Sequence, residues 1–327
     1  MNKLDIGIIG TGNFAHKVHI PVLTERDDVN LAAICDVNQE RLDRIFKQYR
    51  IGKKFSDYKE MIERIPLDGV FIITPPLVTA NVALHCLLRG INTFIEKPPG
   101  MKLEETEKLA RAAKNKGCKT MVGFNRRFCP LVRKAKEMVE KRGQIVQALV
   151  NFHKPAVYGD DLVGDIIHVV DVLRYICGEP QKLFSKISQF YGDKDNSFNS
   201  VIEFENKSVG ILSCYRSSGT RYERFEIHGK NIAAYIRPPR YAQIYEGNKC
   251  ILLEESKIAT FHHAYGYFDE VNHFIEGIKQ DKLVRENNIF EALKTMQLVY
   301  AIKEFQNKGS TEISKIHVNF SKMRNAS

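Results

Sequence analysis

The chain has 327 residues and a formal net charge of +10, from 49 lysines and arginines against 39 acidic residues. This length leaves room for about two domains with substantial cores. The basic residues form no tract with interleaved aromatic side chains, and no apolar run is long enough to span a bilayer, so nucleic-acid and membrane partners are both disfavoured.

A glycine-rich turn follows the first apolar segment. Leu4–Ile9 is almost continuously apolar, which predicts a strand buried on both faces, and a helix is predicted over Asn13–Leu23. Gly10 permits the tight turn, Gly12 lets a pyrophosphate approach the backbone, and Ala15 lets helix and strand pack closely. The helix amino terminus then faces the phosphate. The predicted cofactor contacts in this turn are Gly10, Thr11, Gly12, Asn13, Phe14 and Ala15.

A second predicted strand, Leu31–Cys35, ends in an acidic residue. Asp36 stands about twenty residues beyond the glycine-rich turn, where a carboxylate that binds the adenosine ribose hydroxyls is expected. Because a carboxylate repels a 2′-phosphate, Asp36 favours NAD over NADP as the cofactor. Arg41 is a further predicted cofactor contact, which moderates this preference and leaves NADP possible.

The alternation of strands and helices continues along the next part of the chain. The predicted elements are a strand at Val70–Thr74, a helix at Val78–Arg89, a strand at Thr93–Glu96, a helix at Leu103–Lys116 and a strand at Lys119–Gly123. This pattern predicts a parallel, doubly wound sheet, whose ligands bind at the carboxyl ends of the strands. Asp36, Thr74 and Lys97 lie at such ends, with Pro75 and Glu96 beside them, and all five are predicted to contact the cofactor.

Beyond Gly123 the pattern changes. Helices are predicted at Pro130–Arg142, Leu162–Ile176, Tyr265–Ile278 and Ile289–Phe305, and strands at Ile145–Phe152, Phe198–Glu205, Ser208–Tyr215, Arg224–His228, Ala233–Arg237, Ala242–Glu246 and Ile316–Phe320. The predicted fold class is therefore α/β, an N-terminal Rossmann sheet plus a C-terminal α+β domain with a large open, mostly antiparallel sheet. The predicted domains are residues 1–124 for NAD(P) binding and 125–327 for substrate binding and oligomerisation.

Several of these motifs, taken in order, resemble the Gfo/Idh/MocA oxidoreductases, a family named for glucose-fructose oxidoreductase and inositol dehydrogenase. The resemblance runs over nearly the full length and is carried by Ile6–Ala15, Thr74-Pro75, Gly90 leading into Glu96-Lys97-Pro98, Gly123–Phe128 and Asp165–Asp171. It implies that Lys97 and His168 are active-site residues. It also implies that the segment after Gly123 approaches cofactor and substrate, which makes Asn125 a cofactor candidate and Arg127 a substrate candidate.

The chain departs from the family pattern at two positions. Many members have an aspartate four residues before the helix histidine, where this chain has Gly164, with Asp165 displaced by one. Members also commonly have a histidine shortly after the Thr-Pro turn, where this chain has Thr79. Either Asp165 or Asp171 could still orient His168, or the substrate differs from that of the inositol enzymes.

The predicted chemistry is the oxidation of a secondary alcohol, in which a hydride leaves carbon and a proton leaves the hydroxyl. Histidine, with an unperturbed pKa of about 6.5, accepts a proton at neutral pH more readily than lysine, so His168 is the predicted acid/base and Lys97 the orienting donor. Asp165 is a further substrate candidate. Tyr158, in the loop before the His168 helix, could bond a sugar hydroxyl or be an ordinary loop tyrosine.

The sequence therefore predicts an NAD(H)-dependent oxidoreductase acting on a sugar, cyclitol or sugar derivative. A second hypothesis is a catalytically silent protein that senses a ligand or redox state through a retained dinucleotide site, and Gly164 and Thr79 favour it. A third is an enzyme whose retained NAD permits transient oxidation, followed by elimination or hydrolysis without net NADH.

The basic charge indicates either an ordinary basic surface or an anionic small substrate. Arginines cluster in the second half of the chain, at Arg216, Arg221, Arg224, Arg237 and Arg240. Because a large open sheet exposes an apolar face, a homodimer or homotetramer through that sheet is also expected.

Cysteine and histidine usage gives no sign of a disulfide or a metal site. Seven cysteines form no Cys-x-x-Cys pair and are interpreted as reduced core thiols. No signal peptide precedes the first strand, so a cytoplasmic location is expected. His262 and His263 are adjacent, are expected to point in different directions, and are interpreted as core or pocket-rim residues.

Overall fold

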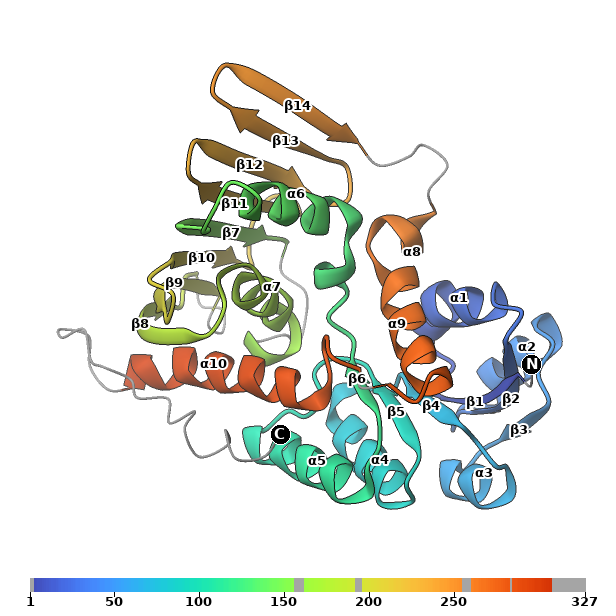
Figure 1. Ribbon diagram of the computed structural model, residues 1–327. Coiled ribbons are helices and arrows are strands. Elements are labelled where there is room, and N and C mark those ends of the chain that lie inside the picture. Colours follow the sequence, from blue (N-terminus) through green and yellow to red (C-terminus); the bar gives the residue numbers. More distant parts are fainter. Residues whose placement is uncertain (1–2, 156–161, 192–195, 255–259, 283, 308–327) are drawn as a thin grey trace. The chain divides into compact units, whose positions relative to one another are not determined.

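The computed structural model describes residues 3–155, 162–191, 196–254, 260–282 and 284–307 (Figure 1). Packing divides the chain into two compact units. The first unit comprises Met1–Asn125 and Gly266–Leu293, and the second comprises Arg126–Tyr265 and Lys294–Ser327. The assignment of cofactor binding to residues 1–124, and of substrate binding and oligomerisation to residues 125–327, stays a prediction.

The first unit is built on a six-stranded parallel sheet. Its strands are β1 (Leu4–Ile9), β2 (Val29–Cys35), β3 (Lys53–Phe55), β4 (Gly69–Ile72), β5 (Asn92–Ile95) and β6 (Thr120–Val122). Their order in space is β3-β2-β1-β4-β5-β6, and every neighbouring pair is parallel. The predicted doubly wound sheet is therefore confirmed. The strand order reverses between β1 and β4, the place where such sheets bind ligands.

Helices cover both faces of this sheet. They are α1 (Ile20–Thr24), α2 (Gln39–Gln48), α3 (Tyr58–Arg64), α4 (Pro76–Leu88), α5 (Leu103–Lys116) and α9 (Tyr267–Lys279). In Figure 1, α1 and α9 lie side by side on one face of the sheet, and α4 and α5 lie side by side on the other. The helix predicted over Asn13–Leu23 is in two parts, since a π-helical turn, η1 (Ala15–His19), precedes α1.

The aromatic core of the first unit joins residues that lie far apart in the sequence. The rings of Phe71 in β4 and Phe94 in β5 stack with centroids 4.7 Å apart. Phe274 of α9 packs edge-on against both, at 5.6 and 5.8 Å. Phe14 likewise meets Tyr267 of α9 at 5.6 Å. The segment that contains α9 thus completes the core formed by the N-terminal strands.

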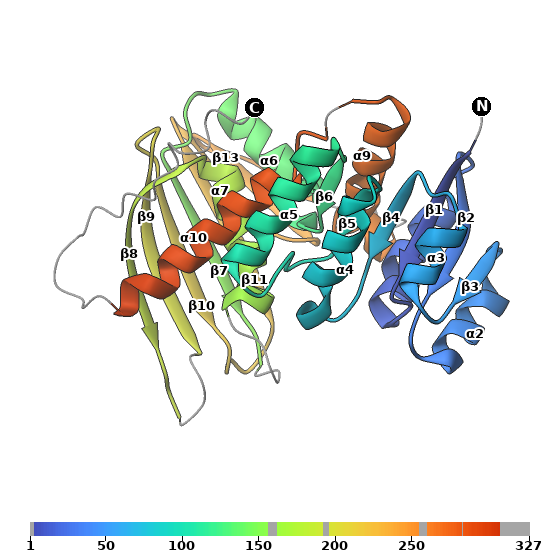
Figure 2. The same ribbon diagram turned by 90° about the horizontal axis from the view of Figure 1, so that it is seen from below.

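The second unit contains an eight-stranded sheet. Its strands are β7 (Gln147–His153), β8 (Pro180–Ser188), β9 (Ser197–Phe204), β10 (Val209–Tyr215), β11 (Tyr222–Gly229), β12 (Ile232–Arg237), β13 (Tyr241–Glu246) and β14 (Lys249–Glu254). The order is β14-β13-β12-β11-β7-β10-β9-β8 (Figures 1 and 2). Among the pairings of these described strands only β7–β10 is parallel, so the predicted open, mostly antiparallel sheet is confirmed.

One face of this sheet is covered and the other carries exposed apolar side chains. Burial alternates along the strands, as the two-residue period of a sheet with one buried face requires. The helices α6 (Pro130–Glu140) and α7 (Ile167–Cys177) pack on the buried face. On the opposite face Val201 is 46% exposed and Leu252 is 53% exposed. A hollow of about 540 Å³ on that face is lined by Arg224, Tyr235, Gln243 and Tyr245.

Two further helices complete the described chain, α8 (Phe261–Ala264) and α10 (Ile289–Asn307). Tyr158 and the strand predicted over Ile316–Phe320 lie outside the described residues. In the ranges that the structure covers, none of the helices combines the length and the apolar character that crossing a bilayer requires. Five of the seven cysteines are buried, and burial raises the pKa of Cys86 and Cys177 to about 12.

Candidate functional site

The glycine-rich turn at the end of β1 contains two glycines, Gly10 and Gly12, whose surroundings differ. Gly10 has a φ of +95°, and a Cβ there would lie 2.3 Å from the carbonyl oxygen of Ile73. Any side chain would therefore clash with the backbone that follows β4. A Cβ on Gly12, by contrast, would meet nothing within 4 Å. The space beside Gly12 is open, as expected where a ligand approaches the backbone.

Asp36 follows β2 and is held against this turn. Its Oδ2 accepts hydrogen bonds from the backbone N–H and the hydroxyl of Thr11, at 2.8 and 2.9 Å. Its Oδ1 accepts from the N–H of Asn38 at 2.8 Å and from Arg41 at 3.2 Å. Burial acts to raise the pKa of Asp36, but the N–H donors of Asn38 and Thr11 outweigh it, so the pKa is lowered and the carboxylate is ionised at neutral pH.

The turn after β4 places two threonines together. The hydroxyls of Thr74 and Thr79 are 2.9 Å apart, and that of Thr79 also donates to the carbonyl of Thr74 or of Pro75. Thr79 is 1% exposed. The residue that stands in place of the family's common histidine therefore stabilises the first turn of α4.

The Glu96-Lys97 segment follows β5 at the same edge of the sheet. Glu96 is buried, and its Oε1 lies 2.7 Å from Nε2 of His19 in η1. Its Oε2 accepts the backbone N–H of Lys97 at 3.2 Å. Asn125, which the sequence predicts as a cofactor contact, is fully buried after β6. The sequence analysis did not identify His19 as a site residue. Its position on the helix that follows the glycine-rich turn was the one feature of the sequence that could have indicated it.

In the second unit, His168 and Asp165 occupy the start of one helix. His168 lies in α7 and is 8% exposed, and Asp165 belongs to a preceding π-helical turn, η3 (Leu162–Ile166). Asp165 forms a close ion pair with Lys154, and its Oδ2 is 3.9 Å from Nε of Arg216. Because Lys154 follows β7 and Arg216 follows β10, the two parallel strands deliver both cations to the same sheet edge. Sequence reasoning did not identify Lys154.

Arg127 and Asp171 form a buried ion pair within the second unit. Nε and Nη2 of Arg127 donate to the two oxygens of Asp171 at 2.7 and 2.6 Å, and the hydroxyl of Thr295 donates to Asp171 at 2.8 Å. The side chains of Arg127 and Asp171 are 6% and 0% exposed. Of the two carboxylates considered as partners of His168, Asp171 is therefore engaged by Arg127 and Thr295. The substrate-binding role of Arg127 stays a prediction.

The arginine cluster of the sequence falls into separate environments. Arg216 is buried beside Asp165. Arg224 lies over the ring of Tyr235 and Arg237 over the ring of Tyr222, on the face of the sheet opposite α6 and α7. Only Arg216 among these three arginines is close to the segment that leads into the His168 helix.

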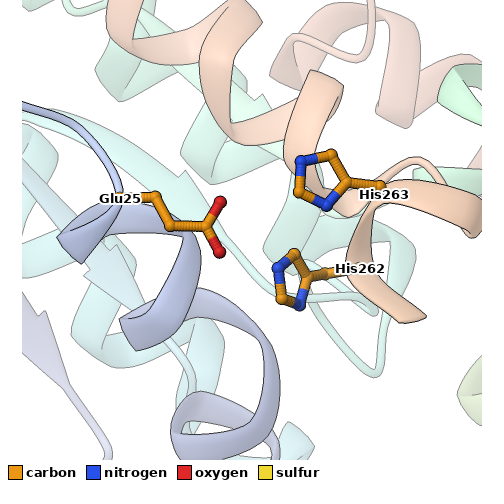
Figure 3. A group of neighbouring side chains, drawn as sticks. All are labelled: Glu25, His262 and His263. Atoms are coloured by element: carbon orange, nitrogen blue, oxygen red, sulfur yellow. The ribbon is translucent and has the colours of Figure 1, made fainter. Parts of the chain in front are cut away.

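One expectation about histidines is wrong. His262 and His263 do not point in different directions: their ring centroids are 5.0 Å apart, and both imidazoles extend to the same side of α8 (Figure 3). The reason is that α8 is a single turn of four residues, and Nδ1 of His263 forms a hydrogen bond with the hydroxyl of Thr260 at its start. The Cβ atoms of neighbouring helical residues differ in direction by about 100°, but the two side-chain torsions of each histidine let both rings turn to the same side.

The residues of the first unit fit an adenine dinucleotide. The open backbone at Gly12 can admit a pyrophosphate next to the start of η1, and the ionised Asp36 can accept ribose hydroxyls. Both oxygens of Asp36 are already hydrogen-bonded, and the exposed Arg41 makes the longest of these bonds. A ribose hydroxyl can therefore take the place of Arg41.

Comparisons with known proteins agree with this geometry. Residues 4–124 match the model of an oxidoreductase family with an NAD-binding Rossmann fold, and residues 132–234 match that of the GFO/IDH/MocA C-terminal domain. The chain is 25% identical to a myo-inositol 2-dehydrogenase of Thermotoga maritima, over 84% of this chain and 88% of that protein. It is 24% identical to a scyllo-inositol 2-dehydrogenase (NAD(+)) of Bacillus subtilis, over 94% and 95%.

Solved structures show the same fold. An oxidoreductase from Agrobacterium radiobacter, in complex with NAD+, L-tartaric acid and magnesium, superposes with a TM-score of 0.85 at 18% identity. The superposition covers 95% of this chain and 98% of that one. The architecture of both sheets is thus shared along nearly the whole chain.

Proposed function

Because the chain belongs to the Gfo/Idh/MocA family of NAD-binding oxidoreductases, we propose that it oxidises a secondary alcohol of a sugar, cyclitol or sugar derivative with NAD, or reduces the corresponding ketone. One observation carries the proposal: Gly12, Asp36 and Lys97 follow three parallel strands of one sheet, at the edge where such sheets bind dinucleotides. The inositol dehydrogenases to which the chain is similar support this class of substrate.

In this proposal two side chains handle the substrate hydroxyl. NAD, when bound, supplies the nicotinamide carbon that accepts the hydride. Nζ of Lys97 donates a hydrogen bond to the hydroxyl oxygen and orients it. Nε2 or Nδ1 of His168 accepts the hydroxyl proton as the C–H bond breaks, so that a ketone and a protonated imidazole result.

A substrate screen tests this function. Sugars, inositols and sugar acids are incubated with NAD or NADP while absorbance of the reduced cofactor is followed and products are analysed. Turnover that produces NADH supports the dehydrogenase. Binding of NAD without exchange on any polyol supports the ligand or redox sensor instead, and product without net NADH supports transient oxidation followed by elimination or hydrolysis.

The two glycines of the turn are expected to respond differently to alanine. Gly12→Ala leaves the free energy of unfolding unchanged, because its Cβ meets no protein atom, but weakens NAD binding about tenfold or more by filling the approach to the backbone. Gly10→Ala costs about 2 kcal/mol of stability, because φ is +95° and Ile73 is in contact. Calorimetric titration with NAD and urea unfolding measure both. If Gly10→Ala and Gly12→Ala had the same free energy of unfolding, the different roles assigned to the two glycines would be wrong.

We further propose that an acidic group of the substrate binds near Lys154 and Arg216. These two residues directly follow the parallel strands β7 and β10, and both lie close to Asp165, which precedes the His168 helix. Arg216→Ala is then expected to raise KM for a sugar acid about tenfold and to change KM for the matching neutral polyol much less. Arg237→Ala, on the opposite face of the sheet, is the control. An equal change in both variants, or none in Arg216→Ala, excludes the anionic substrate.

We propose that the protein is cytoplasmic and assembles as a homodimer or homotetramer through the exposed face of the second sheet. The exposed apolar side chains of Val201 and Leu252 support assembly through this face, because exposed apolar sheet faces are commonly buried by association. Leu252→Asp is expected to reduce the mass measured by light scattering to that of one chain. Leu88→Asp is the control, since Leu88 is also 53% exposed but lies in α4. A Leu252→Asp variant that keeps the wild-type mass contradicts assembly through this face.

A further inference from the structure

Three sequence motifs of the first unit meet at one carboxylate. Glu96, before Lys97, accepts a hydrogen bond from His19, which follows the glycine-rich turn by one helical segment. Gly123, after β6, lies against the same carboxyl group: a Cβ there would sit 2.9 to 3.0 Å from the carboxyl atoms of Glu96. Residues 19, 96 and 123 therefore form one compact arrangement, although they are distant in the sequence.

The direction of the His19–Glu96 hydrogen bond follows from the surroundings of the imidazole. His19 is 0% exposed and is packed against the rings of Phe14, Phe71 and Phe94, with centroids 5.2 to 5.9 Å away. Its Nδ1 has no hydrogen-bond partner among the residues that the structure describes. A bare ring nitrogen tolerates this better than a buried N–H does, so the hydrogen resides on Nε2 and is donated to Oε1 of Glu96.

The other oxygen of the carboxylate acts on Lys97. Oε2 of Glu96 accepts the backbone N–H of Lys97 at 3.2 Å. One oxygen of the Glu96 carboxylate is therefore held by His19, and the other is hydrogen-bonded to the backbone of Lys97. The imidazole that holds Oε1 is packed against three phenylalanine rings, and Gly123 lies so close to the carboxyl group that a Cβ there would clash with it.

We propose that His19 is a positioning residue for Lys97, which it orients through Glu96. The hydrogen bond joins the segment that binds the dinucleotide to the segment that carries the proposed donor to the substrate hydroxyl, so the lysine is placed by the same helix that faces the pyrophosphate. The inference rests on the proposed function for its effect on turnover. Its structural part, the fixing of the Lys97 peptide, does not depend on turnover.

The variants are chosen to separate positioning from packing. His19→Leu keeps an apolar side chain among the phenylalanines but removes the donor to Glu96. His19→Gln keeps a donor, because the side-chain amide of glutamine reaches about as far as Nε2 of histidine. The control is His85→Leu in α4 of the same unit, a part-buried histidine whose ring packs edge-on against Tyr58. Burial lowers the pKa of His85, so this histidine is neutral and its replacement removes no charge.

The first measurement is hydrogen exchange of the NAD-free protein, read on a peptide that contains the Lys97 amide. In His19→Leu the Lys97 amide is expected to exchange at least tenfold faster, whereas His19→Gln and His85→Leu retain wild-type exchange. The strands β1 and β4 keep their protection in all three variants. Unchanged exchange in His19→Leu, a loss that spreads over β1 and β4, or a loss that His19→Gln does not restore, overturns the proposal.

The second measurement compares the effect of each variant on kcat with its effect on the dissociation constant of NAD. In His19→Leu, kcat is expected to fall about ten- to a hundredfold, because a displacement of about 1 Å at a reacting group costs that much, while the dissociation constant of NAD changes less than threefold. His19→Gln recovers most of kcat. If the wild-type protein binds NAD but oxidises no polyol, the proposed function fails, and the exchange experiment alone decides the positioning role.

Discussion

Lys97→Ala is expected to lower kcat by about a thousandfold, while the affinity for NAD falls much less because Lys97 is only one of the predicted cofactor contacts. The physical reason is that Lys97 donates a hydrogen bond that orients and polarises the hydroxyl oxygen, and loss of one positioned donor to an oxygen that gains negative charge costs about 10²- to 10³-fold in rate. Gly12 and Asp36, the residues proposed to contact the nucleotide, are unchanged in this variant, so the loss is expected mainly in the chemical step. Single-turnover rates and calorimetric titration with NAD measure the two quantities separately.

Lys108→Ala serves as the control for this experiment. Lys108 is exposed on α5 of the same unit, so its removal changes the net charge equally without touching the edge where β1, β2 and β5 end. Retention of more than a tenth of the wild-type kcat in Lys97→Ala would exclude Lys97 as the principal donor. A parallel loss of NAD affinity would instead assign the lysine to cofactor binding.

The largest effect on stability is expected for Asp171→Ala, at about 3 to 5 kcal/mol of unfolding free energy. Arg127 and Asp171 make two short hydrogen bonds in a site where the carboxylate is 0% exposed, and removal of Asp171 leaves the Arg127 charge buried without its carboxylate partner. Thr295 loses its acceptor in the same variant. Urea unfolding followed by circular dichroism measures the change.

Two further variants keep this prediction decisive even if Asp171→Ala does not fold. The double replacement Arg127→Met with Asp171→Leu removes both charges and is expected to recover most of the lost stability, as buried ion pairs replaced by apolar groups commonly do. Glu60→Ala breaks the exposed pair with Arg64 and is expected to leave stability unchanged. A double variant as unstable as Asp171→Ala would show that packing, not the buried charge, is the source of the loss.

The N-terminal sheet could be predicted from the sequence because its signals are local. β1 has the predicted bounds, since a buried parallel strand is a continuous apolar run and Gly10 ends it. The segment α2–β3–α3 was missed. β3 has only three residues, two of them exposed lysines, so it carries no apolar period. Asn38 and Asp57 were the local signals for the two helices, because their side chains accept hydrogen bonds from backbone N–H groups in the first turns of α2 and α3.

The side-chain contacts of the candidate site could not be predicted in the same way. The partners His19 and Glu96 are 77 residues apart, and Arg127 and Asp171 are 44 apart. Such pairs are set by which strands and helices become neighbours, and neither spacing nor periodicity encodes that for a single sequence. Lys154 was missed because only the parallel pairing of β7 with β10 brings it to the edge that Arg216 shares.

The packing of α9 has a consequence for how the protein is made. Phe71 and Phe94 are synthesised long before Phe274, which packs against both rings. Until Phe274 has been synthesised, these two rings of the N-terminal sheet lack part of their cover. A fragment that stops at residue 124 lacks this cover and exposes aromatic surface to aggregation. Expression of the dinucleotide-binding half alone therefore calls for a grafted copy of Gly266–Leu293.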